Sequence, residues 1–84
     1  HYLCYLVIDS DWRSWATMAR DVAPNSSVTI DRVEGASSVY LIFSEDVTTS
    51  TGVTLSRGVA YSQVSETLEV TAGSADTLII RVSK

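Results

Sequence analysis

Three residue types that build many functional sites are nearly missing from this sequence: its 84 residues include one cysteine, one histidine and one lysine. The single cysteine, Cys4, cannot form a disulfide within the chain, and its apolar surroundings indicate a buried thiol. The single histidine, His1, provides neither a catalytic base oriented by its neighbours nor the histidine pair of a copper centre. A glycine-rich phosphate loop is also missing. We therefore expect a protein that is not an enzyme, with no metal and no cofactor.

Long apolar runs and clustered basic residues are missing as well. The longest apolar run has seven residues, whereas a membrane-spanning helix needs about 20, so we expect no membrane association. Six basic residues stand against ten acidic ones, which gives a net charge of −4, and the five arginines are spread along the chain. Phosphate binding requires clustered Lys and Arg, so we expect no nucleic-acid partner.

The apolar run itself, YLCYLVI at residues 2–8, is the feature on which a core can be built. Its aromatic and β-branched residues favour a strand. Because successive side chains of a strand point to opposite faces, both faces of this one are apolar. A strand of this kind lies in the middle of a sheet that is covered on both sides.

A different periodicity follows the first run. Trp12, Trp15, Ala16, Ala19 and Val22 fall at helical spacing and predict an amphipathic helix over about residues 10–22. Acidic residues at its start and a proline just beyond its end agree with this prediction. The helix would cover one face of the sheet.

Three further stretches carry strand patterns. Residues 28–34 alternate, and residues 38–43, SVYLIF, are apolar on both faces and predict a second central strand beside residues 2–8. Residues 53–61 alternate around Gly58, which marks either a bulge in one long strand, the interpretation we favour, or the tip of a tight hairpin.

The end of the chain predicts a hairpin in which residues 67–72 and 77–83 are joined by a turn at 73–76. One face of this hairpin is apolar and the other faces solvent, with Ile79 as the odd apolar residue on the solvent side. The apolar face contains Leu68, Val70, Ala72, Leu78, Ile80 and Val82.

These patterns predict a single domain over residues 1–84 of the α+β class. One N-terminal helix packs on a mostly antiparallel sheet of five or six strands, in the chain order β-α-β-β-β-β-β. The alternative is a small β-sandwich or half-barrel with one short helix. In either case the two central strands need two covers, and a chain of this length has little material for the second.

The missing cover suggests a function. We expect a structural or assembly module that associates with a protein partner or with itself as a homo-oligomer, such as a small virion component (phage decoration, tail or fibre protein) or part of an extracellular assembly. A virion or extracellular location is favoured over the cytoplasm. The candidate interface residues are Tyr2, Tyr5, Val7, Tyr40, Ile42 and Ile79.

The alternative function is a small acidic binding protein that occludes a basic site on a larger partner. This reading requires the acidic side chains to gather on one exposed face. The residues available for such a patch are Asp31, Glu34, Glu45, Asp46, Glu66 and Glu69.

Overall fold

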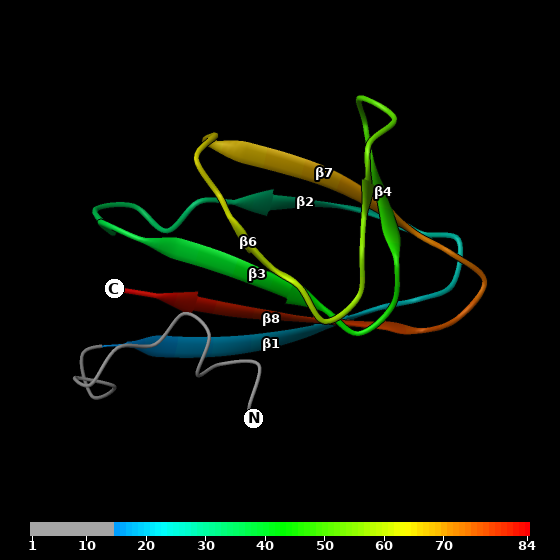
Figure 1. Ribbon diagram of the computed structural model, residues 1–84, viewed down its shortest axis with the longest axis horizontal. Helices are drawn as coiled ribbons and strands as arrows, with labels where there is room; N and C mark the ends of the chain where they lie inside the picture. Colours follow the sequence, from blue (N-terminus) through cyan, green and yellow to red (C-terminus); the bar gives the residue numbers. More distant parts are fainter. Residues whose placement is uncertain (1–14) are drawn as a thin grey trace.

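The computed structural model describes residues 15–84, which form a sandwich of two four-stranded antiparallel sheets (Figure 1). Sheet A has the strand order β1-β8-β3-β6, and sheet B has the order β2-β7-β4-β5. The strands are β1 (Ala16–Val22), β2 (Ser27–Asp31), β3 (Val39–Phe43), β4 (Val47–Thr49), β5 (Thr54–Leu55), β6 (Ala60–Ser62), β7 (Thr67–Ala72) and β8 (Thr77–Ser83).

The helix predicted over residues 10–22 is wrong wherever the structure describes it. Strand β1 pairs with β8 along its whole length, from Ala16 opposite Ser83 to Val22 opposite Thr77. Strand β8 is buried or half-buried along its whole length, so the main-chain groups on both of its edges need partners, and β1 pairs with the edge opposite β3. This pairing outweighs the helix propensity of the Ala, Met and Arg residues in β1.

The fold class is therefore corrected from α+β to all-β over the described residues. The two layers of the alternative, a small β-sandwich, are present, but the helix that this alternative included is not found in residues 15–84. The strand predicted at residues 2–8 and residues 10–14 of the predicted helix lie outside the described residues.

The predicted C-terminal hairpin is also wrong. Strand β7 pairs with β2 and β4 in sheet B, whereas β8 pairs with β1 and β3 in sheet A, so the turn between them crosses from one sheet to the other. Ile79 consequently faces the core between the sheets, and Leu78, Ile80 and Val82 lie on the outer face of sheet A. Alternation could not decide this orientation because both faces of β8 carry apolar side chains.

Residues 53–61 form neither a bulged strand nor a hairpin. Strand β5 pairs with β4 in sheet B, and β6 pairs with β3 in sheet A. Gly58, whose φ is 74°, lies in the connection between these two strands, and its N–H donates to the Phe43 carbonyl at 2.8 Å. A positive φ is open to glycine without a steric penalty, so the chain can turn sharply here and change sheets.

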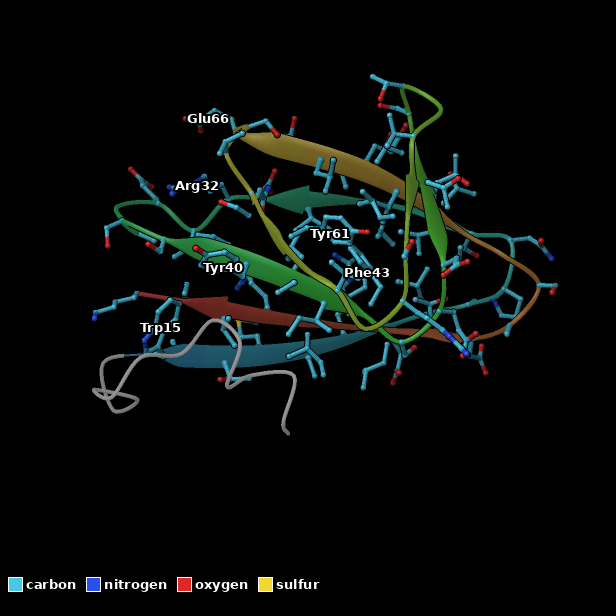
Figure 2. All side chains as sticks on the ribbon, in the orientation of Figure 1. Trp15, Arg32, Tyr40, Phe43, Tyr61 and Glu66 are labelled. Carbon is cyan, nitrogen blue, oxygen red and sulfur yellow. The ribbon has the colours of Figure 1, made fainter. Side chains whose placement is uncertain are left out.

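The core lies between the sheets and is built from side chains of both. Leu41 and Phe43 of sheet A are fully buried and belong to one cluster with Ile30 and Val70 of sheet B. The Phe43 ring lies 6.3 Å from the Tyr61 ring, centroid to centroid, with a tilt of 50° (Figure 2). Tilted aromatic pairs of this kind add to the stabilisation from burial.

The outer faces of the two sheets differ in polarity. Sheet A is apolar on its outer face as well as in the core; this outer face carries Tyr40, Ile42, Leu78, Ile80 and Val82, and Trp15 lies 6.1 Å from the Tyr40 ring (Figure 2). The outer face of sheet B is polar and hydroxyl-rich, with Ser27, Thr29, Thr48, Glu69 and Thr71. Strand β3, with two apolar faces, is an inner strand as its sequence predicts, but its predicted place beside residues 2–8 is wrong, because β8 and β6 occupy its two edges.

Candidate functional site

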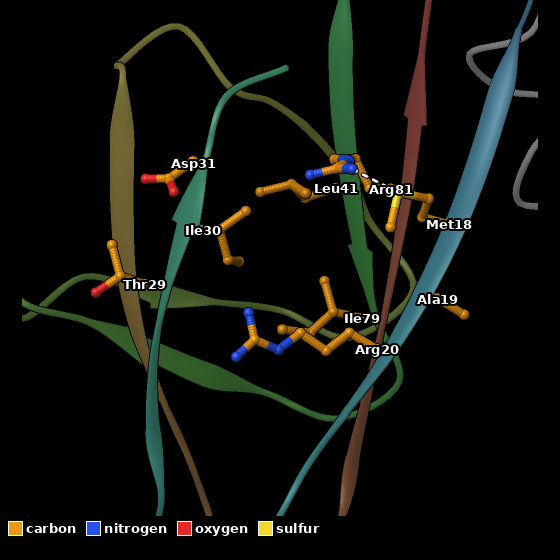
Figure 3. Close-up of a pocket in the computed structure, with 9 residues that line it drawn as sticks. All are labelled: Met18, Ala19, Arg20, Thr29, Ile30, Asp31, Leu41, Ile79 and Arg81. Atoms are coloured by element: carbon orange, nitrogen blue, oxygen red, sulfur yellow. Dashed lines mark hydrogen bonds between the residues drawn. The ribbon is translucent and has the colours of Figure 1, made fainter. Parts of the chain in front are cut away.

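Two sheet edges that have no further strand within residues 15–84 lie on the same side of the sandwich. Strand β1 is the outermost strand of sheet A and β2 is the outermost strand of sheet B, and a short turn over residues 23–26 connects them. Figure 3 shows the two strands bordering a groove that leads down to the core. The opposite side of the sandwich ends in the much shorter strands β5 and β6.

The direction of the main-chain groups on β1 follows from the hydrogen bonds of its neighbour. Lys84 N–H donates to Ser38 O and Ser38 N–H donates to Lys84 O, so the even-numbered residues of β8 bond to β3. Its odd-numbered residues therefore bond to β1, where they face residues with even numbers. This leaves the N–H and C=O groups of Thr17, Ala19 and Asp21 directed away from the sheet.

The main-chain groups of β2 alternate in direction in the same way. Arg32 N–H donates to Glu66 O, and Ala72 N–H donates to Ser26 O, so the even-numbered residues of this segment bond to β7. The main-chain groups of Ser27, Thr29 and Asp31 point away from sheet B. Both edges of the groove therefore present rows of main-chain donors and acceptors that have no partner strand within residues 15–84.

Strand β1 is unusually open for an edge strand. Six of its seven residues are exposed, and 58% of the surface of Met18 is accessible to solvent. Natural edge strands are commonly protected by proline, lysine, a bulge or very short length. Strand β1 has none of these four features, but it carries Arg20 and Asp21, and charged side chains, including inward-pointing ones, are a further protection of natural edges.

The groove between β1 and β2 has a volume of about 210 Å³ and an apolar floor. Leu41 and Ile79 of sheet A and Ile30 of sheet B form this floor, and each of the three belongs to the core cluster. A cavity of about 150 Å³ is large enough for benzene. The groove can therefore hold one or two apolar side chains against the core.

Two arginines enter the groove from sheet A. Met18 and Arg81 are directly opposite each other, as are Arg20 and Ile79, and all four side chains belong to the inward face. Both guanidinium groups point into the space between β1 and β2, whereas the side chains of Thr29 and Asp31 point away from it (Figure 3). Asp31 also borders the groove, but the charged groups that point into it are the two guanidinium groups, although the chain as a whole is acidic.

Neither arginine is neutralised within the described residues. Arg81 Nη2 donates to Met18 Sδ, and no ion pair joins Arg20 or Arg81 to a carboxylate within residues 15–84. Arg81 is half-buried, while Arg20 is exposed. A half-buried cation with a thioether as its partner keeps most of its hydrogen-bonding capacity for another acceptor.

The six candidate interface residues lie in three different regions. Tyr40 and Ile42 lie together on the outer face of sheet A, where Ile42 is buried and Tyr40 is half-buried. Ile79 lies in the core and on the floor of the groove, so packing accounts for its apolar character. Tyr2, Tyr5 and Val7 lie outside the described residues.

The acidic residues do not gather on one face. Asp31, Glu34 and Glu66 border a hollow around Arg32, at the end of the sandwich where β3 begins. Glu45 and Asp46 border a second hollow beyond the other end of β3. Since β3 separates these groups by its full length, the described acidic residues do not form the single negative patch that the alternative function requires.

Residues 15–84 offer neither a metal site nor a membrane-spanning helix. They contain no group of three or more His, Cys, Asp or Glu side chains placed to hold a metal ion. No helix in this part of the chain has the length and apolar character needed to cross a membrane.

The sequence analysis missed the groove, although one signal for it was visible. Arg81 interrupts an otherwise apolar strand, and a charge within such a strand can mark the point where a core opens to solvent. The hairpin prediction instead placed the face that contains Ile79, and therefore also Arg81, on the solvent side. The second arginine, Arg20, belonged to the predicted helix, so the two could not be placed together.

Comparisons with protein-family models, with curated proteins and with solved structures found no match to this chain.

Proposed function

We propose that the protein is a non-enzymatic association module that binds an extended polypeptide segment by strand addition at β1. The outer edge of β1, which has no partner strand within residues 15–84, carries this proposal, because the main-chain groups of Thr17, Ala19 and Asp21 offer a hydrogen-bonding template to an added strand. The partner is a protein, either another copy of the chain or a different polypeptide.

Two further features support association at this edge. The strand is seven residues long, which is longer than the average strand, and it is straight enough to pair with β8 over all seven residues. The groove beside it offers apolar contact for alternate side chains of an added strand. In strand addition, main-chain hydrogen bonds provide affinity and side-chain pockets provide specificity.

Ala19 provides a sharp test, because its N–H points away from β8. Proline at this position removes one outward donor and leaves the bonds to β8 in place, since Ala19 does not take part in them. The matched control is Ala19→Ser, which keeps the N–H. Unchanged pairing between β1 and β8 in the Ala19→Pro variant is checked by the amide NMR spectrum of β8.

The probe is a seven-residue peptide, Thr-Val-Thr-Gln-Thr-Val-Thr, with blocked ends, titrated into the 15N-labelled full chain. We expect shifts at the amides of Thr17, Ala19 and Asp21, retained in Ala19→Ser and lost in Ala19→Pro. A dilution series of the chain alone follows the same amides and reports self-association. If neither experiment shifts these amides, or if Ala19→Pro responds like the parent chain, association at β1 is ruled out.

A further inference from the structure

We infer that the groove between β1 and β2 selects a partner strand carrying an acidic side chain with an aliphatic residue two positions away. This inference rests on the proposed strand addition at β1 and specifies its partner. The acidic side chain is bound by Arg20 and Arg81, and the aliphatic one contacts the floor formed by Leu41, Ile79 and Ile30.

The positions of the two arginines on sheet A support a shared ligand. Arg20 lies directly opposite Ile79, and Arg81 is two residues further along β8, so the arginines are diagonal neighbours on one face. Diagonal neighbours of an antiparallel pair are about 7–8 Å apart, within the combined reach of two long side chains. Both guanidinium groups point into the groove, where they can bind the two oxygens of one carboxylate (Figure 3).

The spacing of the partner residues follows from strand geometry. Side chains that point into the groove from an added strand are two residues apart, at about 6.6–6.8 Å. The inward rows of sheet A have the same spacing, with Met18 and Arg81 in one row and Arg20 and Ile79 in the next. When an acidic side chain of the added strand lies at one row, the side chain two positions away on that strand lies at the next row, over the apolar floor.

Charge complementarity chooses an acidic partner over a basic or neutral one. Two cations of like sign share the groove, and no carboxylate within residues 15–84 pairs with either. An entering carboxylate relieves this repulsion and gains hydrogen bonds to charged donors. The net charge of −4 acts in the opposite direction, since it attracts basic peptides at long range. A preference for an acidic peptide can therefore come only from a local feature.

The test uses the glutamine peptide described above together with two relatives in which the central residue is glutamate or lysine. The central residue and both valines of each peptide share one face. Affinities are measured by NMR titration of the full chain at low salt and at about 0.5 M NaCl. We expect the glutamate peptide to bind about tenfold more tightly than the glutamine peptide, and the lysine peptide to bind most weakly. The preference for glutamate should shrink at high salt because exposed charges are screened.

Three variants show which arginines cause the preference for the glutamate peptide. Arg81→Gln and Arg20→Gln should each lower the glutamate preference several-fold, and Arg57→Gln, which changes an arginine bordering the hollow at Glu45 and Asp46, should leave it unchanged. Because Arg81 is half-buried, its variant is first compared with the parent chain by thermal melting. Arg20 is exposed, so the Arg20→Gln result stands even if Arg81→Gln unfolds.

The outcomes separate this inference from the proposed function. Equal binding of the glutamate and glutamine peptides at β1 would overturn the inference and leave strand addition in place. A glutamate preference that survives in both Arg20→Gln and Arg81→Gln would also overturn it. Absence of binding by all three peptides would overturn the inference, and it would overturn strand addition as well if dilution of the chain also leaves the β1 amides unchanged. A glutamate preference that is lost in Ala19→Pro and reduced in the arginine variants supports both.

Discussion

The side-chain amide of Gln63 donates a hydrogen bond to the main-chain carbonyl of Ile30 at 3.0 Å, and this bond joins the two sheets at one end of the sandwich. Gln63 follows β6 of sheet A, and its own N–H donates to Val39 O, whereas Ile30 belongs to β2 of sheet B. The Gln63 side chain is 3% exposed, and its Oε1 has no hydrogen-bond partner. A buried polar link of this kind contributes to stability only while its donor is satisfied.

Gln63→Glu should destabilise the protein by about 2–3 kcal/mol at pH 7, because an ionised carboxylate is buried and the donor to Ile30 O is lost. Burial raises the pKa of a carboxyl group, so the folded variant takes up a proton as the pH falls. The protonated carboxyl group can donate to Ile30 O.

The stability deficit of Gln63→Glu relative to the parent chain should therefore be full at pH 7 and shrink toward pH 4. Urea unfolding of both proteins at each pH measures this difference, and the parent chain corrects for its own ten carboxylates. A deficit that stays constant across this range would contradict the buried position of the Gln63 side chain.

Arg32→Lys should lower the free energy of unfolding by about 1–2 kcal/mol. Arg32 Nε donates to Gln63 O and its Nη1 donates to Ala36 O, both at 2.9 Å, so one planar guanidinium fastens two loops. A lysine ammonium keeps the charge but cannot reproduce the forked geometry. Arg57→Lys is the matched control, since no hydrogen bond from the Arg57 side chain is present within residues 15–84, and it should change stability by less than about 0.5 kcal/mol. Equal losses of unfolding free energy in the two variants would show that the two hydrogen bonds of the Arg32 guanidinium contribute nothing to stability.

Gly52→Ala and Gly73→Ala should have opposite effects on stability. Both positions have space for a methyl group, but the φ of Gly52 is 87° and Gly73 is not in the positive-φ region. Alanine at position 52 should cost about 1–2 kcal/mol because its Cβ disfavours this conformation. Alanine at position 73 should be neutral or stabilising by up to about 1 kcal/mol, because it restricts the unfolded chain. Thermal melting of the pair checks the sign of each effect.

Leu41→Ala should destabilise the protein by about 2–5 kcal/mol, because Leu41 is fully buried between the sheets and its removal leaves a cavity. Val64→Ala, at a position 88% exposed, should change stability by less than about 0.5 kcal/mol. Chemical denaturation of both variants measures the contrast. A small loss for Leu41→Ala would mean that the open groove beside it already admits solvent to this part of the core.

The alternation of residues located several strands but not their partners. Residues 38–43, 67–72 and 77–83 were recognised as strands, and β3, β7 and β8 lie within them. The strand predicted at residues 28–34 extends too far, since β2 ends at Asp31. The alternation did not show which strands pair with one another, because a strand with apolar side chains on both faces fits several neighbours equally well.

The candidate groove was beyond the reach of sequence reasoning for a related reason. Arg20 and Arg81 are 61 positions apart along the chain, and they meet because β1 pairs with β8. Once residues 16–22 were taken as a helix, that pairing was lost. The wrong prediction arose from the helical spacing of Trp15, Ala16, Ala19 and Val22. Strand β1 places the last three of these side chains on two different faces of sheet A.

The order of amino acids was thus sufficient to indicate that the segments of β3, β7 and β8 are extended and that β3 is an inner strand. The folded chain was needed to show which sheet each strand joins, which face of β8 is turned to the core, and where an edge is left open. The physical reason is that alternation records how a strand divides its side chains between two faces, whereas the choice of neighbour depends on contacts between residues far apart in the chain.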